Sequence, residues 1–211
     1  MTDTNLAVPE LATVEMKAFT RHSFIIRSAL TAGAVYGLGA VGPFVSQALA
    51  QNEKPVDVLN FALTLEYLEA TFYTRGIKRL SLTGEAKDLA QTLRDNEVEH
   101  VDALKATIKD LGGTPTRAPR VDFDQAYDSQ ESFLELAQTL EDTGVAAYNG
   151  AAPALVNEDK LLAAAGSIVQ VEARHAAAIR ALNLEPIADD AFDRGQPRAE
   201  VLEKVDQFIV S

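Results

Sequence analysis

Two motifs of one kind constrain this sequence more than any other feature: in each, a glutamate stands three residues before a histidine. They are Glu97-Val-Glu-His100 and Glu172-Ala-Arg-His175, and the second begins 75 residues after the first. On a helix, side chains three residues apart project from nearly one face, so the carboxylate and the imidazole can bind the same metal ion. With 16 glutamates in 211 residues, chance would give both histidines this neighbour with odds on the order of one in a hundred. The motifs therefore predict two helices that share a metal centre.

A second set of residues repeats with the same offset. Glu66 and Glu141 stand 75 residues apart, and a tyrosine follows each of them by seven residues, at Tyr73 and Tyr148. Seven residues make about two helical turns, so each tyrosine projects to the same side as its glutamate. Two Glu-x-x-His motifs and two single glutamates are the ligand set of a dinuclear carboxylate site in a four-helix bundle. The shared offset predicts two similar halves that meet at the metal centre.

Two further glutamates compete for the single-glutamate positions. Glu69 lies three residues after Glu66, about 60° around the same helix. The 75-residue offset selects Glu66, because the residue that corresponds to Glu69 is Gly144. Glu69 stays open as an extra or alternative carboxylate. Glu135 precedes Glu141 on another face of its helix, so Glu141 is the preferred ligand.

The apolar residues follow a helical period, with proline, glycine and polar residues at the breaks, and they predict four long helices and no β-strand. We expect these helices at about residues 54–77, 85–111, 129–155 and 160–182. Their connections are short, long and short, which indicates two helical hairpins joined by one crossover at residues 114–129. The tail from Glu185 is loop-like, with a short helix expected from about Arg198 to Ile209. The predicted fold is all-α.

The first fifty residues differ from the rest of the chain. A basic stretch precedes a run without charge, residues 28–50, which ends in small residues up to Ala50. This order predicts an export signal cleaved after Ala50, and it resembles a twin-arginine signal in which Arg21-His22 replaces the two arginines. The run is also long enough for an uncleaved membrane anchor. We therefore expect three segments in a protein of the periplasm or cell envelope: 1–50 for export or anchoring, 51–184 for the bundle, and 185–211 for the tail.

Composition excludes several classes of function. The formal net charge of −12 argues against nucleic acid and anionic membrane surfaces as partners. The chain has no cysteine, which excludes disulfides, thiolate metal clusters and cysteine nucleophiles. It also lacks a glycine-rich nucleotide-binding motif, and with His100 and His175 assigned to metal no histidine of the bundle remains to serve as a triad base. Metal ions are the partners that the sequence favours.

These residues together resemble those of ferritin-like di-iron proteins, and more closely those of exported ferritin-like domain proteins related to plant desiccation-associated proteins. The resemblance covers residues 54–182. It rests on residues 59–73, Glu97-Val-Glu-His100, Leu140-Glu141 with Tyr148, and Glu172-Ala-Arg-His175. It implies the ferritin-like form of the four-helix bundle. That fold hosts ferritins, rubrerythrins, manganese catalases and di-iron oxygenases, so it does not select an activity.

The resemblance also implies a role for each ligand of a centre with two metal ions. Glu66 and Glu141 would be terminal carboxylates, His100 and His175 terminal imidazoles, and Glu97 and Glu172 bridges between the two ions. Six oxygen and nitrogen ligands leave positions open for dioxygen or peroxide. They suit iron first and manganese second, rather than copper or a closed zinc site. No catalytic residue is expected beyond these ligands.

Residues next to the ligands carry further expectations. Tyr73 and Tyr148 would hydrogen-bond a metal-bound carboxylate or relay electrons, unless they are ordinary buried tyrosines with satisfied hydroxyls. In some ferritin relatives an aspartate precedes the bridging glutamate and orients a histidine, and here Asn96 and Val171 stand at these positions. The resemblance therefore implies that this support is altered in one half and missing in the other.

The expected function is that of an exported di-iron protein that handles iron or reactive oxygen under stress, with an oxidase or peroxidase type of activity. One alternative is a non-enzymatic envelope or stress protein in which the metal stabilises the bundle. Another is a manganese-type catalase. A homo-oligomer or an envelope-associated partner is compatible with each hypothesis, whereas an iron-storage cage would have to accommodate both the N-terminal segment and the tail.

Overall fold

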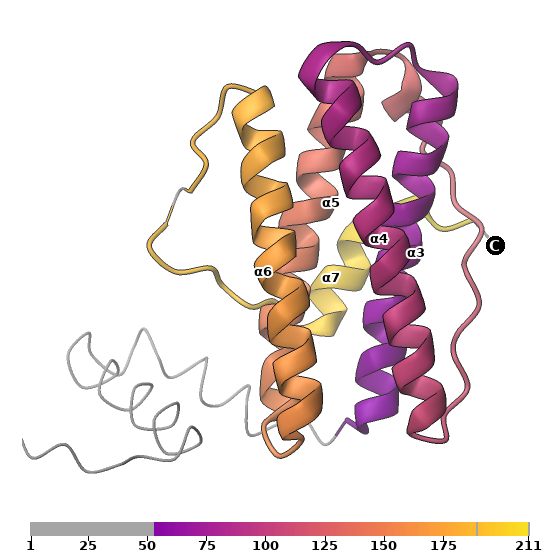
Figure 1. The fold of residues 1–211 in the computed structure, drawn as a ribbon, viewed down its shortest axis with the longest axis vertical. Coiled ribbons are helices and arrows are strands. Elements are labelled where there is room, and N and C mark those ends of the chain that lie inside the picture. Colours follow the sequence, from indigo (N-terminus) through magenta and orange to yellow (C-terminus); the bar gives the residue numbers. More distant parts are fainter. Residues whose placement is uncertain (1–52, 189, 211) are drawn as a thin grey trace, which may run out of the picture. The chain divides into compact units, whose positions relative to one another are not determined.

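The computed structural model describes residues 53–188 and 190–210, and four long helices make up most of this part of the chain (Figure 1). They are α3 (Pro55–Arg79), α4 (Gly84–Asp110), α5 (Gln130–Ala151) and α6 (Asp159–Leu182). The closest packing is within the pairs α3–α4 and α5–α6, and the two pairs meet through α3 against α5 and α4 against α6. The predicted all-α bundle of two hairpins is confirmed.

The predicted export signal or anchor, residues 1–50, lies outside the described residues and stays a prediction. Among the residues that the structure describes, no helix has both the length and the apolar character needed to cross a membrane.

Helix boundaries follow from local chemistry. Pro55 opens α3 at the first helical position, where its missing N–H costs no hydrogen bond. Ser129 caps α5: its hydroxyl accepts the backbone N–H of Ser132, whose hydroxyl accepts the N–H of Ser129 in return, at 3.1 Å each. After α4, Gly112 has φ +74°, the left-handed conformation that ends many helices. These signals place the helices where the sequence predicts them.

Three details differ from the prediction. The third helix ends as an α-helix at Ala151 and continues as the 3-10 turn η3 (Ala152–Leu155), because the ring of Pro153 cannot follow a regular helical turn. The crossover contains a 3-10 turn, η2 (Asp124–Tyr127), that the sequence does not predict. The tail helix α7 (Arg198–Val205) ends earlier than predicted and passes into the 3-10 turn η4 (Asp206–Phe208).

The crossover, residues 111–129, runs along α3 and is fixed to it by hydrogen bonds. The side chain of Asn60 accepts the backbone N–H of Thr116 at 2.7 Å and donates to the carbonyl of Thr114 at 3.2 Å. Farther along α3, Arg75 donates to the carbonyl of Val121 at 2.7 Å. The two hairpins are therefore connected by an ordered segment.

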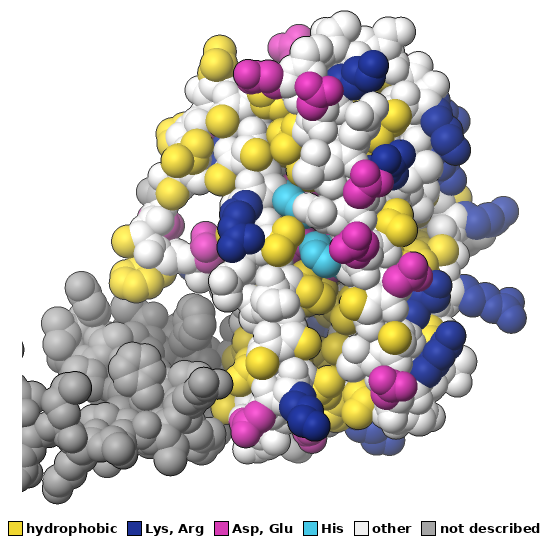
Figure 2. All heavy atoms as spheres, in the orientation of Figure 1, with side chains coloured by type: hydrophobic (Ala, Val, Ile, Leu, Met, Phe, Trp, Pro, Cys, Tyr) yellow, Lys and Arg dark blue, Asp and Glu magenta, His cyan; other side chains and the backbone are white. Residues whose placement is uncertain are grey.

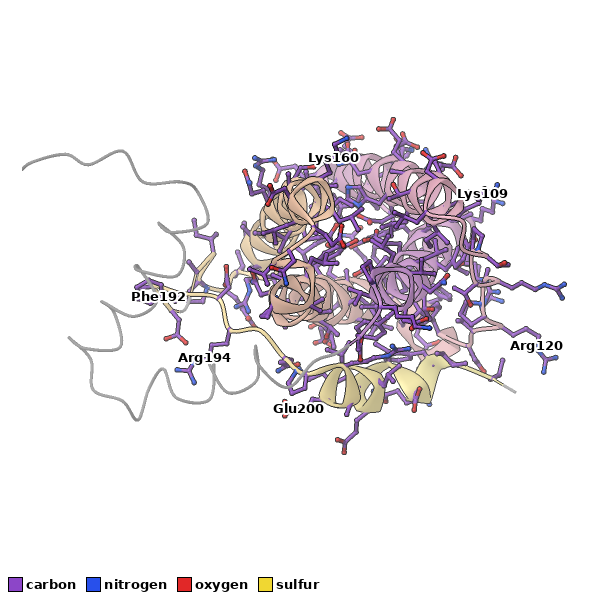
Figure 3. All side chains as sticks on the ribbon, turned by 90° about the horizontal axis from the view of Figure 1, so that it is seen from below. Lys109, Arg120, Lys160, Phe192, Arg194 and Glu200 are labelled. Atoms are coloured by element: carbon purple, nitrogen blue, oxygen red, sulfur yellow. The ribbon has the colours of Figure 1, made fainter. Side chains whose placement is uncertain are left out.

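The tail adds a fifth helix to one side of the bundle. Viewed along the helices, α7 lies against the bundle with Glu200 pointing away from it, whereas Phe192 lies on a loop that projects outward (Figure 3). Val201 and Val205 of α7 are buried in the core. After α7, the backbone N–H of Val210 donates to the carbonyl of Arg120 at 2.9 Å, which ties the end of the tail to the crossover.

The interior of the bundle consists of two apolar regions separated by a polar layer. One region contains Phe72 and Phe133, whose rings stack with centroids 4.7 Å apart, and the other contains Leu63, Leu104 and Ile108. The layer between them holds the buried charged residues Glu66, Glu69, Glu97, Glu141, Glu172 and His175, which lie near the middle of the four long helices. The apolar regions supply the packing that holds this layer in place.

Two glycine variants test this packing. A Cβ on Gly76 of α3 would lie 2.3 Å from Cε2 of Phe133, and the stacked ring of Phe133 has no room to move. We expect Gly76→Ala to lower the free energy of unfolding by about 1–3 kcal/mol. Gly166 lies inside α6, and a Cβ there would meet nothing within 4 Å. Gly166→Ala should therefore raise the free energy of unfolding by about 0.5–1 kcal/mol. Urea unfolding measures both, and equal effects would contradict the described packing.

Candidate metal centre

All six predicted ligands meet in the polar layer of the bundle. Glu66 comes from α3, Glu97 and His100 from α4, Glu141 from α5, and Glu172 and His175 from α6. Their ligand atoms form two groups, each with all its atoms within 4.8 Å of one another: Glu66, Glu97, His100 and Glu172 in the first, and Glu97, Glu141, Glu172 and His175 in the second. Glu97 and Glu172 belong to both groups. This arrangement is compatible with a dinuclear metal site.

The contacts of the imidazoles show how closely the donor atoms converge. Nδ1 of His100 lies near one oxygen of each of three glutamates, 3.2 Å from Glu66, 3.0 Å from Glu97 and 3.1 Å from Glu172. Nδ1 of His175 lies 2.9 Å from Glu97 and 3.3 Å from Glu141. A single N–H proton can serve one of these oxygens well, but a cation can bind all of them at once.

The cluster also leaves buried polar atoms without hydrogen bonds. These atoms are Oε1 of Glu97, Oε2 of Glu141, both carboxylate oxygens of Glu172 and Nδ1 of His175. All of them except Oε2 of Glu172 take part in the imidazole–carboxylate contacts, but these contacts lack hydrogen-bond geometry. Burial of polar groups without hydrogen bonds is costly. Donor atoms about 3 Å apart match the edge of an octahedron around an ion with bonds of about 2.1 Å. The residues present therefore fit a pair of cations.

The electrostatics show how the cluster carries its charge when no cation is bound. Burial raises the pKa of Glu66 well above its usual range, with a further contribution from Glu172, and burial raises the pKa of Glu172 itself to about 8. For Glu97, burial acts to raise the pKa, but the imidazoles of His100 and His175 outweigh it and hold the pKa at about 2. Burial acts to lower both imidazole pKa values, but the adjacent carboxylates raise them to about 12 for His100 and about 10 for His175. When no cation is bound, protons on these residues therefore offset the negative charge of the buried carboxylates.

Two tyrosines hold the single glutamates, and they do so across the two hairpins. The hydroxyl of Tyr73 on α3 donates to Oε1 of Glu141 on α5 at 2.5 Å. The hydroxyl of Tyr148 on α5 donates to Oε1 of Glu66 on α3. In both glutamates the other oxygen, Oε2, is the one that faces a histidine. The tyrosines therefore leave one oxygen of each glutamate directed into the cluster.

The two histidines differ in their outer contacts. The Asn96 amide lies 2.9 Å from Nε2 of His175, so a residue of α4 orients an imidazole of α6. Within the described residues, no side chain makes the equivalent contact with His100, whose side chain is 12% exposed against 5% for His175. This geometry agrees with the expectation from the sequence. Asn96, in place of an aspartate, contacts one histidine, and Val171 offers no polar group to the other. Figure 2 shows histidine at the surface between α4 and α6, where the cluster reaches solvent.

The competing glutamates separate clearly. Glu135 is exposed on α5, whereas Glu141 is fully buried. Glu69 is only 3% exposed and lies beside the cluster without belonging to either ligand group. A Cβ on Gly144 would lie 3.1 Å from Oε1 of Glu69. Gly144 stands at the position equivalent to Glu69, and its missing side chain leaves space for the carboxylate. This glycine was the sequence signal that could have predicted the burial of Glu69.

Comparisons with known proteins agree with the fold. The family model of the ferritin-like domain matches residues 54–196. A crystal structure described as ferritin-like, diiron-carboxylate proteins from Bacillus anthracis str. Ames matches with a TM-score of 0.54 and 24% sequence identity, covering 61% of this chain and 94% of that one. At this identity the likeness concerns the fold alone. No curated protein matches the sequence.

The protons in the cluster predict a pH dependence for the metal-free protein. In the folded chain the pKa values of His100, His175 and Glu172 are about 12, 10 and 8, each above the ordinary values of 6.5 for histidine and 4.5 for glutamate. The folded state therefore binds more protons than the unfolded state, and the free energy of unfolding should fall as pH rises from about 6 to 9. Urea unfolding after chelation of metals, repeated across this range, measures the slope.

Glu172→Gln should flatten this slope, because it removes one of the protonated groups, and Glu135→Gln, at the exposed position, should leave it unchanged. A free energy of unfolding that stays constant or rises toward pH 9 would contradict the assigned protonation.

Proposed function

The chain belongs to the family of ferritin-like domains, and from this premise we propose that its polar layer binds two metal ions, with iron as the first choice. The observation that carries the proposal is the pair of ligand groups that share Glu97 and Glu172 in a buried interior. In this assignment Glu66 and His100 would hold one ion, Glu141 and His175 would hold the other, and Glu97 and Glu172 would serve both.

The charges support two divalent ions. The four glutamate ligands carry four negative charges when ionised, and two divalent cations with neutral imidazoles balance them. A neutral cluster removes most of the cost of charge in a low-dielectric interior. Oxygen and nitrogen donors suit iron or manganese, and the similar crystal structure, described as a diiron-carboxylate protein, favours iron over manganese.

The residues of the chain prepare a site for chemistry with dioxygen or peroxide. Two bound ferrous ions would supply two electrons to such an oxidant. Tyr73 and Tyr148 keep Glu141 and Glu66 directed into the cluster, and the apolar regions on either side exclude water. His100, whose side chain is 12% exposed, borders solvent on the side of α4 and α6 where histidine is visible (Figure 2), and we expect small ions and oxidants to reach the ligands from this side.

A structural role for the metal is the second candidate, and one observation favours it. A cation would satisfy the buried atoms of Glu97, Glu141 and Glu172 that lack hydrogen bonds, whether or not a reaction follows. In that case the protein would serve as a stress or envelope protein without turnover. Export to the periplasm or envelope is part of both proposals and rests on the sequence of residues 1–50.

Metal binding is tested on the full chain after a chelator has removed its metal. The metal-free protein is titrated anaerobically with Fe(II) or Mn(II), and calorimetry measures the binding. We expect two ions per chain, and about 2.7 kcal/mol of added stability for each site at which free metal exceeds its dissociation constant 100-fold. Glu172→Gln should weaken both positions, because Glu172 belongs to both ligand groups. Glu99→Gln makes the same change of charge at an exposed position of α4 and should bind like the unaltered chain. Identical behaviour of the two variants would count against the assignment.

Activity is tested by adding peroxide to the chain loaded with Fe(II). Each peroxide takes two electrons and two protons and gives two water molecules as two ferrous ions become ferric, so we expect one peroxide consumed per loaded chain. Peroxide consumption and the absorbance of ferric iron measure this ratio. Thermal stabilisation by metal without peroxide consumption would support the structural role, and oxygen evolution with Mn(II) would support a catalase.

A further inference from the structure

Glu69 is a buried carboxylate that the six-ligand assignment does not use. It lies on α3 one turn after Glu66 and is 3% exposed. No described residue donates a hydrogen bond to it, and its neighbours in a small pocket between α3, α5 and α7 include the apolar side chains of Leu65, Leu68 and Val205. An ionised carboxylate in such surroundings is costly unless a cation lies nearby. A leucine would serve packing better.

Gly144 of α5 faces Glu69 and leaves room for its carboxylate beside the cluster. A Cβ built on Gly144 of α5 would lie 3.1 Å from Oε1 of Glu69 and 3.2 Å from Oε2 of Glu172. Both oxygens therefore border the same bare stretch of backbone, and Oε2 of Glu172 is buried without a hydrogen-bond partner. Any larger residue at this position would crowd the two carboxylates. Gly144 thus provides the space in which Glu69 comes next to a predicted bridging ligand.

We propose that Glu69 is a fifth carboxylate of the metal centre, supplied by the first hairpin and matched in the second hairpin only by the space at Gly144. The inference rests on the proposed binding of two metal ions. It makes the centre asymmetric, because six ligands come in equivalent pairs and the seventh donor has no counterpart. Its chemical class is that of a hard oxygen donor, which suits iron and manganese.

The fifth carboxylate changes the balance of charge. Five ionised glutamates carry five negative charges, one more than two divalent ions neutralise, whereas two trivalent ions carry six positive charges. Glu69 therefore stabilises the oxidised metal pair more than the reduced one. If its loss reduces the preference for Fe(III) tenfold, the one-electron reduction potential rises by about 59 mV.

Glu69→Gln tests the inference, with Glu99→Gln as the matched control at an exposed position. The full chain of each variant is titrated anaerobically with Fe(II), and the reduction potential of the iron-loaded protein is measured by spectroscopic redox titration. We expect Glu69→Gln to keep two irons, to weaken one of the two positions about 10-fold or more, and to raise the potential. The metal-free variant should be at least as stable as the unaltered chain, because a buried carboxylate is removed.

A second variant, Gly144→Ala, places a methyl group between Glu69 and Glu172 and should shift affinity and potential in the same direction. If Glu69→Gln binds two irons with unchanged affinity and potential, the inference on Glu69 is wrong and the proposed function stands. If metal-free Glu69→Gln loses stability, Glu69 has a packing role and the inference is again wrong. If the unaltered chain binds no metal, the proposed function itself fails.

Discussion

The burial of like-charged carboxylates in one layer of the bundle is the constraint on which the rest of the structure depends. Four fully buried glutamates lie at mid-length of four helices, between two apolar regions that keep water away. Their mutual repulsion has to be offset locally, because the four carboxylates are fully buried and solvent screens them little. The imidazoles, the tyrosine hydroxyls and, in our proposal, two cations are the groups that offset it. Long helices are needed for this arrangement, since several turns of apolar packing above and below the layer must hold each carboxylate in position.

The inner contacts of the layer are nearly the same in both halves. Nδ1 of His100 lies 3.1 Å from Glu172, and Nδ1 of His175 lies 2.9 Å from Glu97, so each histidine contacts the predicted bridging glutamate of the other motif. The tyrosine contacts cross in the same way, between α3 and α5. Neither hairpin therefore completes a ligand group alone. Association of the hairpins and assembly of the site are one event.

Much of the fold and of the candidate metal centre could be predicted from residue spacing, because the spacing of ligands on a helix decides which side chains share a face. The helices, their hairpin order and the convergence of six ligands follow from periodicity and the 75-residue offset. The crossed pairing of Tyr73 with Glu141 and the contact of Asn96 with His175 could not be predicted, since both depend on how the two hairpins are placed against each other.

The burial of Glu69 could not be predicted from helical periodicity, for a different reason. In this bundle the face that carries Glu69 is also covered, by α5 and α7, and helical period alone does not show which faces have a second neighbour.

Near the metal centre, the two halves differ in the residues around the six paired ligands. Asn96 reaches His175, while Val171 offers His100 nothing equivalent, and Glu69 occupies space that Gly144 leaves open. Each proposed metal position has the same types of terminal ligand, one glutamate and one histidine, and shares the same two bridges. A difference in affinity or redox potential between the positions therefore cannot come from the six paired ligands. It has to come from the surrounding contacts: the orientation of an imidazole, its exposure to solvent, and the charge of one additional carboxylate.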